Sequence, residues 1–330
     1  MKGLPSLLLA FALAFASPLI TTANAADEQK AILVTGASTG IGRNIAERLA
    51  AEGHFVYAGA RKAEDIAALS AIENVQGIRL DVTAQEEIDA AVQLVRDGGR
   101  GLYAIVNNAG VNVVGPLIEL DEGELDFLFD VNVYGPYRIT RAFAPLVIES
   151  RGRINNVSSI SGTLSGALYG VYSMSKHAIE AYTDSLAIEM RQLGVRVSAV
   201  EPGNYKSEIG NSRCKRFLNQ DVNAEESYFT DYVNRLIDNC ENRPENTSPE
   251  PDDVSAAVLH ALFDDDPKEH YMVVPSQFQA EITVRKAIEE VVALNKGHVF
   301  SYSDEELLQM LKEELETGDA FVRSISGPRP

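Results

Sequence analysis

The sequence predicts an α/β fold, in which a doubly wound parallel sheet is covered by helices on both faces. Short apolar runs alternate along the chain with longer segments whose apolar residues recur at helical spacing. A glycine-rich turn at residues 36–42 joins the first apolar run to the first helical segment. Because no internal repeat or low-complexity linker divides residues 26–330, we expect a single domain with one core.

Seven strands are expected at the short apolar runs. The first run, AILV at residues 31–34, is apolar throughout, which suits a strand buried on both faces of a parallel sheet. The other runs lie at residues 55–58, 78–80, 104–106, 153–157, 195–200 and 270–274.

Helices are expected between these strands. In residues 41–51, Ile41, Ile45 and Leu49 share one face while charged side chains occupy the other, which is the pattern of an amphipathic helix. Similar spacing predicts further helices at residues 86–95, 125–133, 171–191 and 252–262.

Two later segments depart from the strand–helix alternation. Residues 204–250 are polar and weakly patterned, and they follow the sixth strand at the sheet edge where open α/β sheets bind ligands. We therefore expect this insertion to be a lid. Residues 303–330 predict a C-terminal helical extension, because Ser303 and Glu306 form a capping box before leucines at helical spacing. We assign that extension to packing or to an oligomer contact.

Residues 1–25 are expected to be a signal peptide or an N-terminal anchor. Lys2 precedes a short apolar run, Pro18 follows it, and Ala23 and Ala25 form the small-x-small pattern of a cleavage site. The run is short for a membrane span. An exported, periplasmic protein is the favoured prediction. The alternatives are a membrane-anchored protein, or a cytoplasmic one if the true start lies downstream.

Composition excludes several classes of partner. The net charge is −19, and no cluster of lysine and arginine is present, so we expect no nucleic-acid partner. Membrane contact is expected only if the N-terminal segment is retained. Two cysteines, Cys214 and Cys240, exclude a Cys-rich metal site, and we predict no metal. If the chain is exported, these two cysteines would be able to pair within the lid.

The glycine-rich turn indicates a dinucleotide site. Gly36, Gly40 and Gly42 allow a tight turn and a close approach of the backbone to a pyrophosphate, whose charge the following helix N-terminus stabilises. Glycines also occur in turns for their conformational freedom alone. The preceding strand and the following helix favour the functional interpretation.

A tyrosine and a lysine share one face of the helix expected at residues 171–191. Tyr172 and Lys176 are four residues apart, so their side chains are neighbours on the helix surface. A nearby ammonium favours the phenolate, and we expect it to lower the pKa of Tyr172 toward the working pH. Tyr172 would then act as a general acid/base. Such a pair also occurs by chance on solvated helix faces.

Taken together, the motifs resemble those of the short-chain dehydrogenase/reductase superfamily. They follow the order of the expected strands and comprise Thr35-Gly36-x-x-x-Gly40-Ile41-Gly42, Asn107-Asn108-Ala109-Gly110, Asn132, Ser159, Tyr172-x-x-x-Lys176 and Pro202-Gly203. The resemblance is strong over residues 30–205 and implies a Rossmann-type fold and a nicotinamide cofactor. Residues 200–205 are similar to the retinol and 17β-hydroxysteroid dehydrogenase-like members.

The resemblance implies four catalytic residues. Tyr172 would exchange a proton with the substrate oxygen while hydride moves to or from the nicotinamide, and Ser159 would hydrogen-bond the same oxygen. Lys176 would bind the nicotinamide ribose and lower the pKa of Tyr172. Asn132 would hold a water that continues the proton path.

The cofactor is expected to be NADP, with NAD as the alternative. No carboxylate follows the second strand, where an NAD enzyme binds the ribose, and Arg61 offers a planar cation for a 2′-phosphate. By resemblance, the expected cofactor contacts are Gly36, Ser38, Gly40, Ile41, Gly42, Arg61, Asp81, Val82, Asn108, Ala109, Gly110, Tyr172, Lys176, Pro202 and Gly203.

The substrate is expected to be a small-molecule alcohol or carbonyl compound. The resemblance implies an apolar secondary alcohol or ketone, or a retinoid or steroid, processed by a homodimer or homotetramer. The lid carries polar residues, Arg213 among them, which keeps a smaller or carboxylate-bearing carbonyl compound open. The alternative function is a non-catalytic cofactor-binding or scaffold protein of the same fold. The presence of all four catalytic side chains argues against it.

Overall fold

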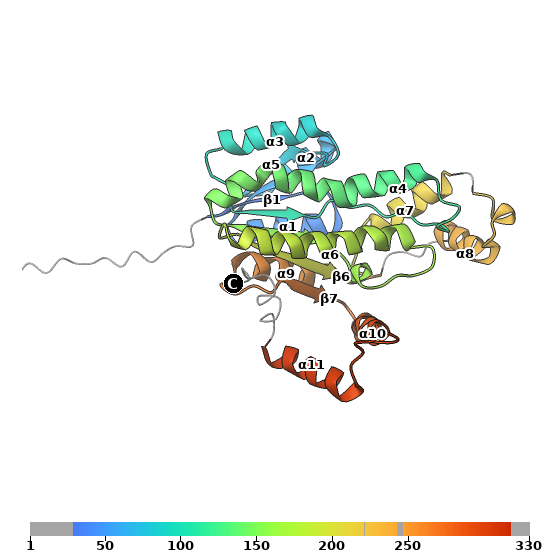
Figure 1. Ribbon diagram of the computed structural model, residues 1–330. Coiled ribbons are helices and arrows are strands. Elements are labelled where there is room, and N and C mark those ends of the chain that lie inside the picture. The colour runs from blue at the N-terminus through green and yellow to red at the C-terminus, as the bar shows by residue number, and fades with distance from the viewer. Residues whose placement is uncertain (1–28, 221, 243–246, 318–330) are drawn as a thin grey trace, which may run out of the picture.

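A parallel sheet of seven strands organises the protein (Figure 1). The computed structural model describes residues 29–220, 222–242 and 247–317. All neighbouring strands are parallel, in the order β3-β2-β1-β4-β5-β6-β7. The strands are β1 (Ala31–Val34), β2 (Phe55–Ala60), β3 (Val75–Arg79), β4 (Ala104–Asn107), β5 (Arg153–Val157), β6 (Arg196–Pro202) and β7 (His270–Val273). The doubly wound parallel sheet predicted from the sequence is confirmed.

Helices cover both faces of this sheet. One face is covered by α1 (Gly40–Ala51), α2 (Ala63–Ser70) and α9 (Asp252–Phe263). The other is covered by α3 (Gln85–Asp97), α5 (Gly135–Glu149) and α6 (Gly170–Arg191). Helix α4 (Glu122–Phe129) and a π-helical segment η1 (Asp130–Tyr134) lead directly into α5.

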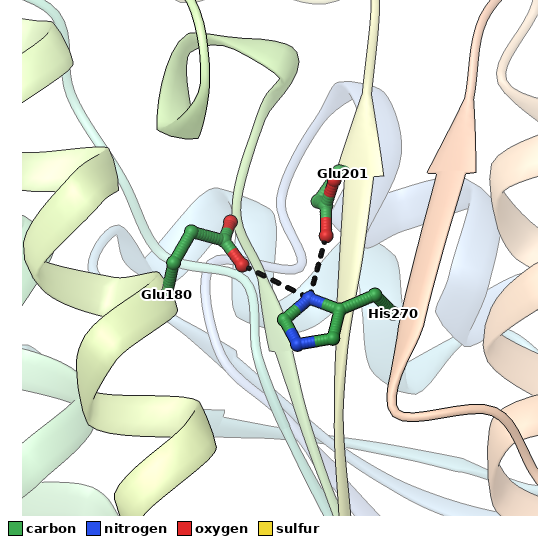
Figure 2. A group of neighbouring side chains, drawn as sticks. All are labelled: Glu180, Glu201 and His270. Atoms are coloured by element: carbon green, nitrogen blue, oxygen red, sulfur yellow. Dashed lines mark hydrogen bonds and ion pairs between the residues drawn. The ribbon is translucent and has the colours of Figure 1, made fainter. Parts of the chain in front are cut away.

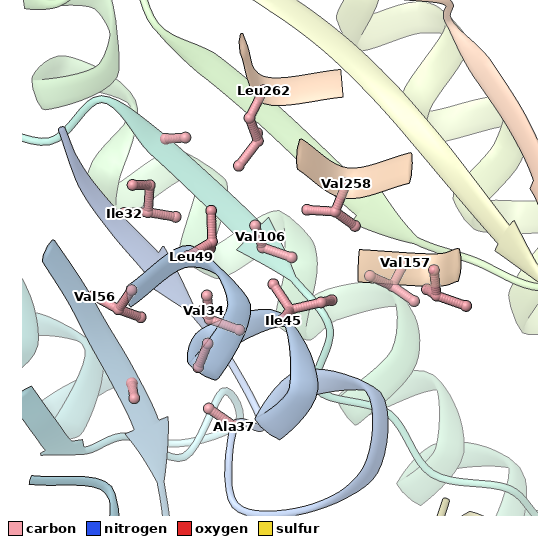
Figure 3. Packing of buried hydrophobic residues seen from close by; sticks show 14 of the residues in the cluster. Ile32, Val34, Ala37, Ile45, Leu49, Val56, Val106, Val157, Val258 and Leu262 are labelled. Carbon is pink, nitrogen blue, oxygen red and sulfur yellow. The ribbon is translucent and has the colours of Figure 1, made fainter. Parts of the chain in front are cut away.

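The core has two halves because alternate residues of each strand face opposite sides of the sheet. Ile32 and Val34 of β1 pack with α1 and α9, as Figure 3 shows, whereas Ala31 and Leu33 pack with the helices of the other face. Fully buried residues on both sides explain why β1 reads as a continuous apolar run.

The expected strands are all present, with ends that differ by a few residues. The expected helices are also present, but α2, α5, α10 (Gln277–Leu294) and the two helices within residues 204–250 were not predicted. The π-helical segment shifts the helical phase before α5, and Pro145 lies inside that helix. Helix α10 buries only Thr283, and its apolar residues at helical spacing, such as Val284, Ile288 and Val291, are exposed.

The segment expected to be a lid contains two helices joined by a disulfide. Helices α7 (Ile209–Leu218) and α8 (Thr230–Glu241) lie beyond one end of the sheet (Figure 1). Cys214 and Cys240 are bonded to each other, with their Cα atoms 5.1 Å apart. A small apolar cluster, which includes Phe217 and Val233, surrounds the disulfide. The pairing considered for an exported chain is therefore present.

The C-terminal extension begins at the expected cap. Helix α11 (Asp304–Thr317) starts after Ser303, whose backbone N–H donates to Glu306 Oε2 at 2.7 Å while Ser303 Oγ accepts from the Glu306 N–H at 3.3 Å. Within the described residues, no helix combines the length and hydropathy that a membrane span requires. The signal peptide expected at residues 1–25 lies outside the described residues.

Candidate active site

The glycine-rich turn connects β1 to α1 at the carboxyl edge of the sheet. Gly36 and Gly40 have positive φ angles of +64° and +55°, which glycine adopts without strain. A Cβ on Gly36 would lie 2.8 Å from the Cα of Ala109, and one on Gly42 would lie 2.2 Å from Asn108 Nδ2. The turn therefore leaves bare backbone above the N-terminus of α1, and this fits a dinucleotide pyrophosphate.

Thr35 and Asn108 hold this turn against the end of β4. Thr35 Oγ1 accepts hydrogen bonds from the backbone N–H groups of Asn108 and Ala109, both at 3.0 Å. Asn108 Nδ2 donates to the carbonyl oxygens of Thr35 and Gly36 at 2.9 and 3.0 Å. The side chain of Asn108 therefore fixes the protein backbone. Thr35, which the sequence analysis named only as part of the motif, is a positioning residue.

Tyr172, Ser159 and Lys176 meet beside the carboxyl ends of β5 and β6. Ser159 Oγ accepts from the Ser161 N–H at 3.1 Å and donates to the Pro202 carbonyl at 3.5 Å, and it lies close enough to the Tyr172 phenol to act on its pKa. Lys176 is buried, its Nζ donates to the carbonyl oxygen of Val157 at 3.0 Å, and it lies 5.7 Å from the centre of the Tyr172 ring. The helical spacing of the pair and the end of β5 thus bring a hydroxyl, a phenol and an ammonium to one place.

Asn132 lies in the π-helical segment and is joined to α6. Its Nδ2 donates to the Val111 carbonyl at 2.9 Å and to Ser175 Oγ at 3.1 Å, and its Oδ1 accepts from the Val111 N–H at 2.8 Å. Ser175 Oγ in turn donates to the Tyr172 carbonyl at 2.8 Å. The side chain of Asn132 thus connects the loop after β4 to the backbone of Tyr172. Sequence reasoning missed Ser175 as the link.

The expected direction of the Tyr172 pKa was wrong. Burial raises the pKa of Tyr172 to about 12, against a smaller lowering by the hydrogen bond with Ser159. Burial lowers the pKa of Lys176 to about 8, and the nearby Glu180 carboxylate only partly opposes this. The physical reason is that both groups lie out of water, where their charged forms are disfavoured, while the ammonium is directed at the Val157 carbonyl.

For the carbonyl reduction that the sequence resemblance implies, these directions predict how the rate depends on pH. Tyr172 stays protonated through neutral pH and can donate its proton, whereas Lys176 loses its charge as the pH rises through about 8. We expect kcat/KM for reduction to be level below about pH 8 and to fall above it.

The variant Lys176→Arg provides the control, because a guanidinium keeps its charge at high pH. Whatever its absolute rate, its kcat/KM should not fall in this pH range. A fall at the same pH in the arginine variant would assign the titration to another group. Initial rates from about pH 6 to about pH 10 with one carbonyl substrate measure both profiles.

Arg61 and Asp81 lie together at the ends of β2 and β3. Arg61 Nη1 is 3.8 Å from Asp81 Oδ2, and the Arg61 side chain is 64% exposed. Asp81 Oδ1 accepts from the N–H and the hydroxyl of Thr83 at 2.9 and 2.7 Å. Val82 is buried against Gly135, so only its backbone is available to a cofactor. The exposed guanidinium remains accessible to an anion.

The other predicted cofactor residues lie along the same edge of the sheet. Gly110 follows β4, near the Asn132 side chain. Pro202 is the buried last residue of β6, and Gly203 is covered by α10, since a Cβ there would lie 2.2 Å from Gln279 Oε1. A Cβ on Gly40 would lie 3.0 Å from the Ser207 Cβ. The first residues of the lid therefore pack against the glycine-rich turn.

A cavity of about 490 Å³ lies between the lid and the rest of the protein. Its walls come from the loop after β4, from α7 and α8, and include Glu119, Leu120, Phe217 and Val233. None of the four predicted catalytic residues lines it. The cavity thus belongs to the underside of the lid, and the predicted catalytic side chains lie outside it.

A polar cluster beside Lys176 was missed by sequence reasoning. His270 of β7 contacts Glu180 and Asp184 of α6 and Glu201 of β6. The hydrogen bond with Asp184, followed by the contacts with Glu180 and Glu201, raises the pKa of His270 to about 12. Two signals were available: a glutamate next to the last residue of β6, and a second glutamate four residues after Lys176.

Comparison with known proteins shows which family the sequence resembles. A family model described as short chain dehydrogenase matches residues 30–216. This range contains both the glycine-rich turn and the helix segment with Tyr172 and Lys176.

Individual proteins show the same similarity. Mitochondrial D-beta-hydroxybutyrate dehydrogenase of Bos taurus is 32% identical over 267 residues, which cover 73% of this chain and 76% of that protein. Short-chain dehydrogenase/reductase family 9C member 7 of Bos taurus is 34% identical over 257 residues, which cover 73% and 80%. A solved short chain dehydrogenase from Burkholderia cenocepacia in complex with NADP has 25% identity and a TM-score of 0.63, covering 81% of this chain and 96% of that one.

Proposed function

This chain belongs to the short-chain dehydrogenase/reductase family of NAD(P)-dependent oxidoreductases acting on CH–OH groups, and on that premise we propose that it interconverts an apolar secondary alcohol and its ketone with NADP. The observation that carries the proposal is the meeting of Tyr172, Ser159 and Lys176 at the same carboxyl edge of the sheet as the glycine-rich turn. Fold alone does not define an activity. The site supplies a proton donor, a hydroxyl that orients the substrate and a cation.

Each side chain has a distinct task in the proposed mechanism. A bound nicotinamide supplies the hydride in the reducing direction and takes it up in the oxidising one. Ser159 donates a hydrogen bond to the substrate oxygen and holds it near Tyr172, whose hydroxyl transfers its proton to that oxygen. Lys176 places a positive charge beside the phenol and stabilises the phenolate that remains. Asn132 holds the helix that carries Tyr172 in place.

An apolar wall near Tyr172 supports an apolar substrate. Leu117 packs against Gly170, at the start of the helix that carries Tyr172. Leu117 and Ile118 are 55% and 75% exposed. Exposed apolar side chains beside a catalytic group favour binding of apolar substrate surface.

One observation favours a second candidate, a small carbonyl compound with a carboxylate. Arg213 of the lid donates to the Tyr169 hydroxyl at 2.6 Å, and its Nε is buried without a hydrogen-bond partner among the described residues. A guanidinium with an unused donor is suited to a carboxylate. Tyr169 lies three residues before Tyr172, so such an anion would lie near the catalytic group.

The proposed reaction is tested by initial rates with NADPH and NADH on a panel of carbonyl compounds. The panel runs from acetoacetate through medium-chain ketones to retinal and a 17-keto steroid. We expect the highest kcat/KM with NADPH and an apolar ketone. Preference for acetoacetate, weakened by Arg213→Gln while apolar ketones are unaffected, would establish the second candidate. Absence of turnover with every compound, despite cofactor binding, would favour a non-catalytic member of the family.

The same assay tests Arg61 as the residue that selects NADP. The variant Arg61→Gln removes a charge-assisted contact with a 2′-phosphate, worth about 1.5–3 kcal/mol. The KM for NADPH should therefore rise by about 10- to 100-fold, whereas the KM for NADH should barely change. The matched control is Arg48→Gln, because Arg48 is an exposed arginine of α1 that pairs with Glu52. Equal KM changes for the two cofactors would contradict the assignment.

The proposal also covers assembly and location. A homodimer or homotetramer is supported by apolar side chains exposed on α10 and α11, such as Phe278 and Leu315, and sedimentation equilibrium measures the mass. Export is supported by the disulfide in the lid, since disulfides persist in oxidising compartments. Cell fractionation tests the location.

A further inference from the structure

Four ionisable side chains from three elements converge beside the sheet. His270 of β7 lies between Glu201 of β6 and Glu180 of α6, and Figure 2 shows both carboxylates directed at the same ring nitrogen. Nδ1 of His270 is 2.8 Å from Glu201 Oε1 and 3.3 Å from Glu180 Oε2. On the other side of the ring, Nε2 is 2.8 Å from Asp184 Oδ1.

This cluster has more acceptors than donors. An imidazole nitrogen carries at most one proton, and the Nδ1 proton serves Glu201 through a hydrogen bond. Both carboxylate oxygens of Glu180 are buried and accept no hydrogen bond from the described residues. The ion-pair contact of Glu180 with Nδ1 at 3.3 Å gives attraction without a shared proton. A buried carboxylate with unused lone pairs is suited to an additional cation.

We propose that Glu180, Glu201 and His270 form a binding site for a divalent transition-metal ion, with Nδ1 and one oxygen from each carboxylate as ligands. These three ligand atoms lie within 4.8 Å of one another. Ligands bound at about 2.0–2.2 Å in tetrahedral or octahedral geometry are about 3.0–3.5 Å apart. The two distances at Nδ1, 2.8 and 3.3 Å, are close to that spacing, so small side-chain adjustments suffice to admit the ion.

Asp184 supplies the hydrogen bond to the second ring nitrogen that a metal-binding histidine needs. A metal-bound histidine usually donates its other N–H to a carboxylate, which fixes the tautomer and orients the ring. Asp184 accepts from Nε2 in this way, and Nδ1 is then free to bind metal in place of its proton. One imidazole and two carboxylates suit zinc or manganese better than magnesium. The His270 side chain is 43% exposed, which leaves access for the ion and for water ligands.

The charge balance favours a divalent cation. Three carboxylates face one imidazole, and Glu180 also interacts electrostatically with Lys176, four residues earlier on α6. A protonated imidazole supplies one positive charge to the cluster, whereas a divalent ion supplies two. The ion would join α6 to β6 and β7 immediately behind Lys176. This site does not depend on the proposed substrate or on the direction of the reaction.

The test uses the tag-free full-length protein, dialysed against a chelator and then titrated with Zn²⁺ by calorimetry and with Co²⁺ by visible absorption. We expect one ion per chain and Co²⁺ bands typical of mixed nitrogen and oxygen ligands. The variants Glu201→Gln and His270→Gln should abolish both signals. Asp184→Asn should weaken binding by about 10- to 100-fold, as loss of an outer-shell partner does.

His260→Gln is the matched control. His260 of α9 also lies beside a carboxylate, at 3.5 Å from Asp264, but outside the cluster, and its replacement should leave binding unchanged. Circular dichroism of each variant separates loss of the site from loss of the fold, and Asp184→Asn keeps the three ligands if a ligand variant does not fold. Absence of saturable binding to the wild-type protein, or binding retained by folded Glu201→Gln and His270→Gln, would overturn the proposal.

Discussion

Replacing Tyr172 by phenylalanine should lower kcat by about 10²- to 10⁴-fold, the range contributed by general acid/base catalysis. The substitution removes one hydroxyl and keeps the ring, so the packing around the site changes little. With a pKa raised to about 12 by burial, the hydroxyl is protonated at neutral pH. Without it, the substrate oxygen keeps Ser159 as a hydrogen-bond partner but has no proton donor.

Cofactor binding should survive this substitution. The glycine-rich turn and Arg61 are unaffected, so the Kd for NADPH, measured by fluorescence, should change by less than about threefold. Tyr169→Phe is the matched control because Tyr169 is the tyrosine before α6 and its hydroxyl bonds Arg213 of the lid. It should keep kcat for apolar ketones. Turnover by the Tyr172 variant at the wild-type rate would disprove the assigned mechanism.

Of the substitutions considered, removal of the disulfide should lower the free energy of unfolding most. Cys214 and Cys240 are separated by 26 residues in the sequence, and a cross-link closing a loop of that length stabilises a protein by about 3 kcal/mol. The bond is also buried, in the small apolar cluster that holds α7 against α8. The double variant Cys214→Ser/Cys240→Ser should therefore unfold its lid at lower urea concentration than the wild type.

Reduction of the wild-type protein provides the internal control. Dithiothreitol should lower the midpoint of lid unfolding in the wild type to that of the double variant, and should leave the variant unchanged. Hydrogen exchange of α7 and α8, followed by mass spectrometry, locates the loss of stability in the lid. Two free thiols in the folded, non-reduced protein would contradict the pairing.

Much of the fold could be predicted from the sequence because its signals are local. The run at residues 31–34 and the spacing of Ile41, Ile45 and Leu49 report directly on which side chains are buried. Helix α5 follows a π-helical segment that disturbs the periodicity. Helix α10 is mostly exposed, and its apolar residues at helical spacing lie outside the buried core. Those two helices required the tertiary structure.

The candidate site, like the fold, could be predicted only in part from the sequence. The sequence identified Tyr172, Lys176 and Ser159 because the chemistry of the motif resides in residue type and order. Their ionisation could not be predicted from spacing alone. The expectation of a lowered pKa for Tyr172 rested on the neighbouring ammonium, whereas in the folded protein burial of the phenol outweighs it.

The sequence by itself determined the alternation of strands and helices, the family motifs and the identity of the proposed catalytic residues. The tertiary structure decided which of these side chains are buried, that a disulfide joins the two helices of the lid, and that His270 contacts Glu180 and Glu201. Burial and long-range contact depend on how distant segments pack together. The pKa of a buried side chain follows from that packing, because it depends on the electrostatic field of residues that are distant in the sequence. A set of metal ligands also follows from it, because its members come from distant segments.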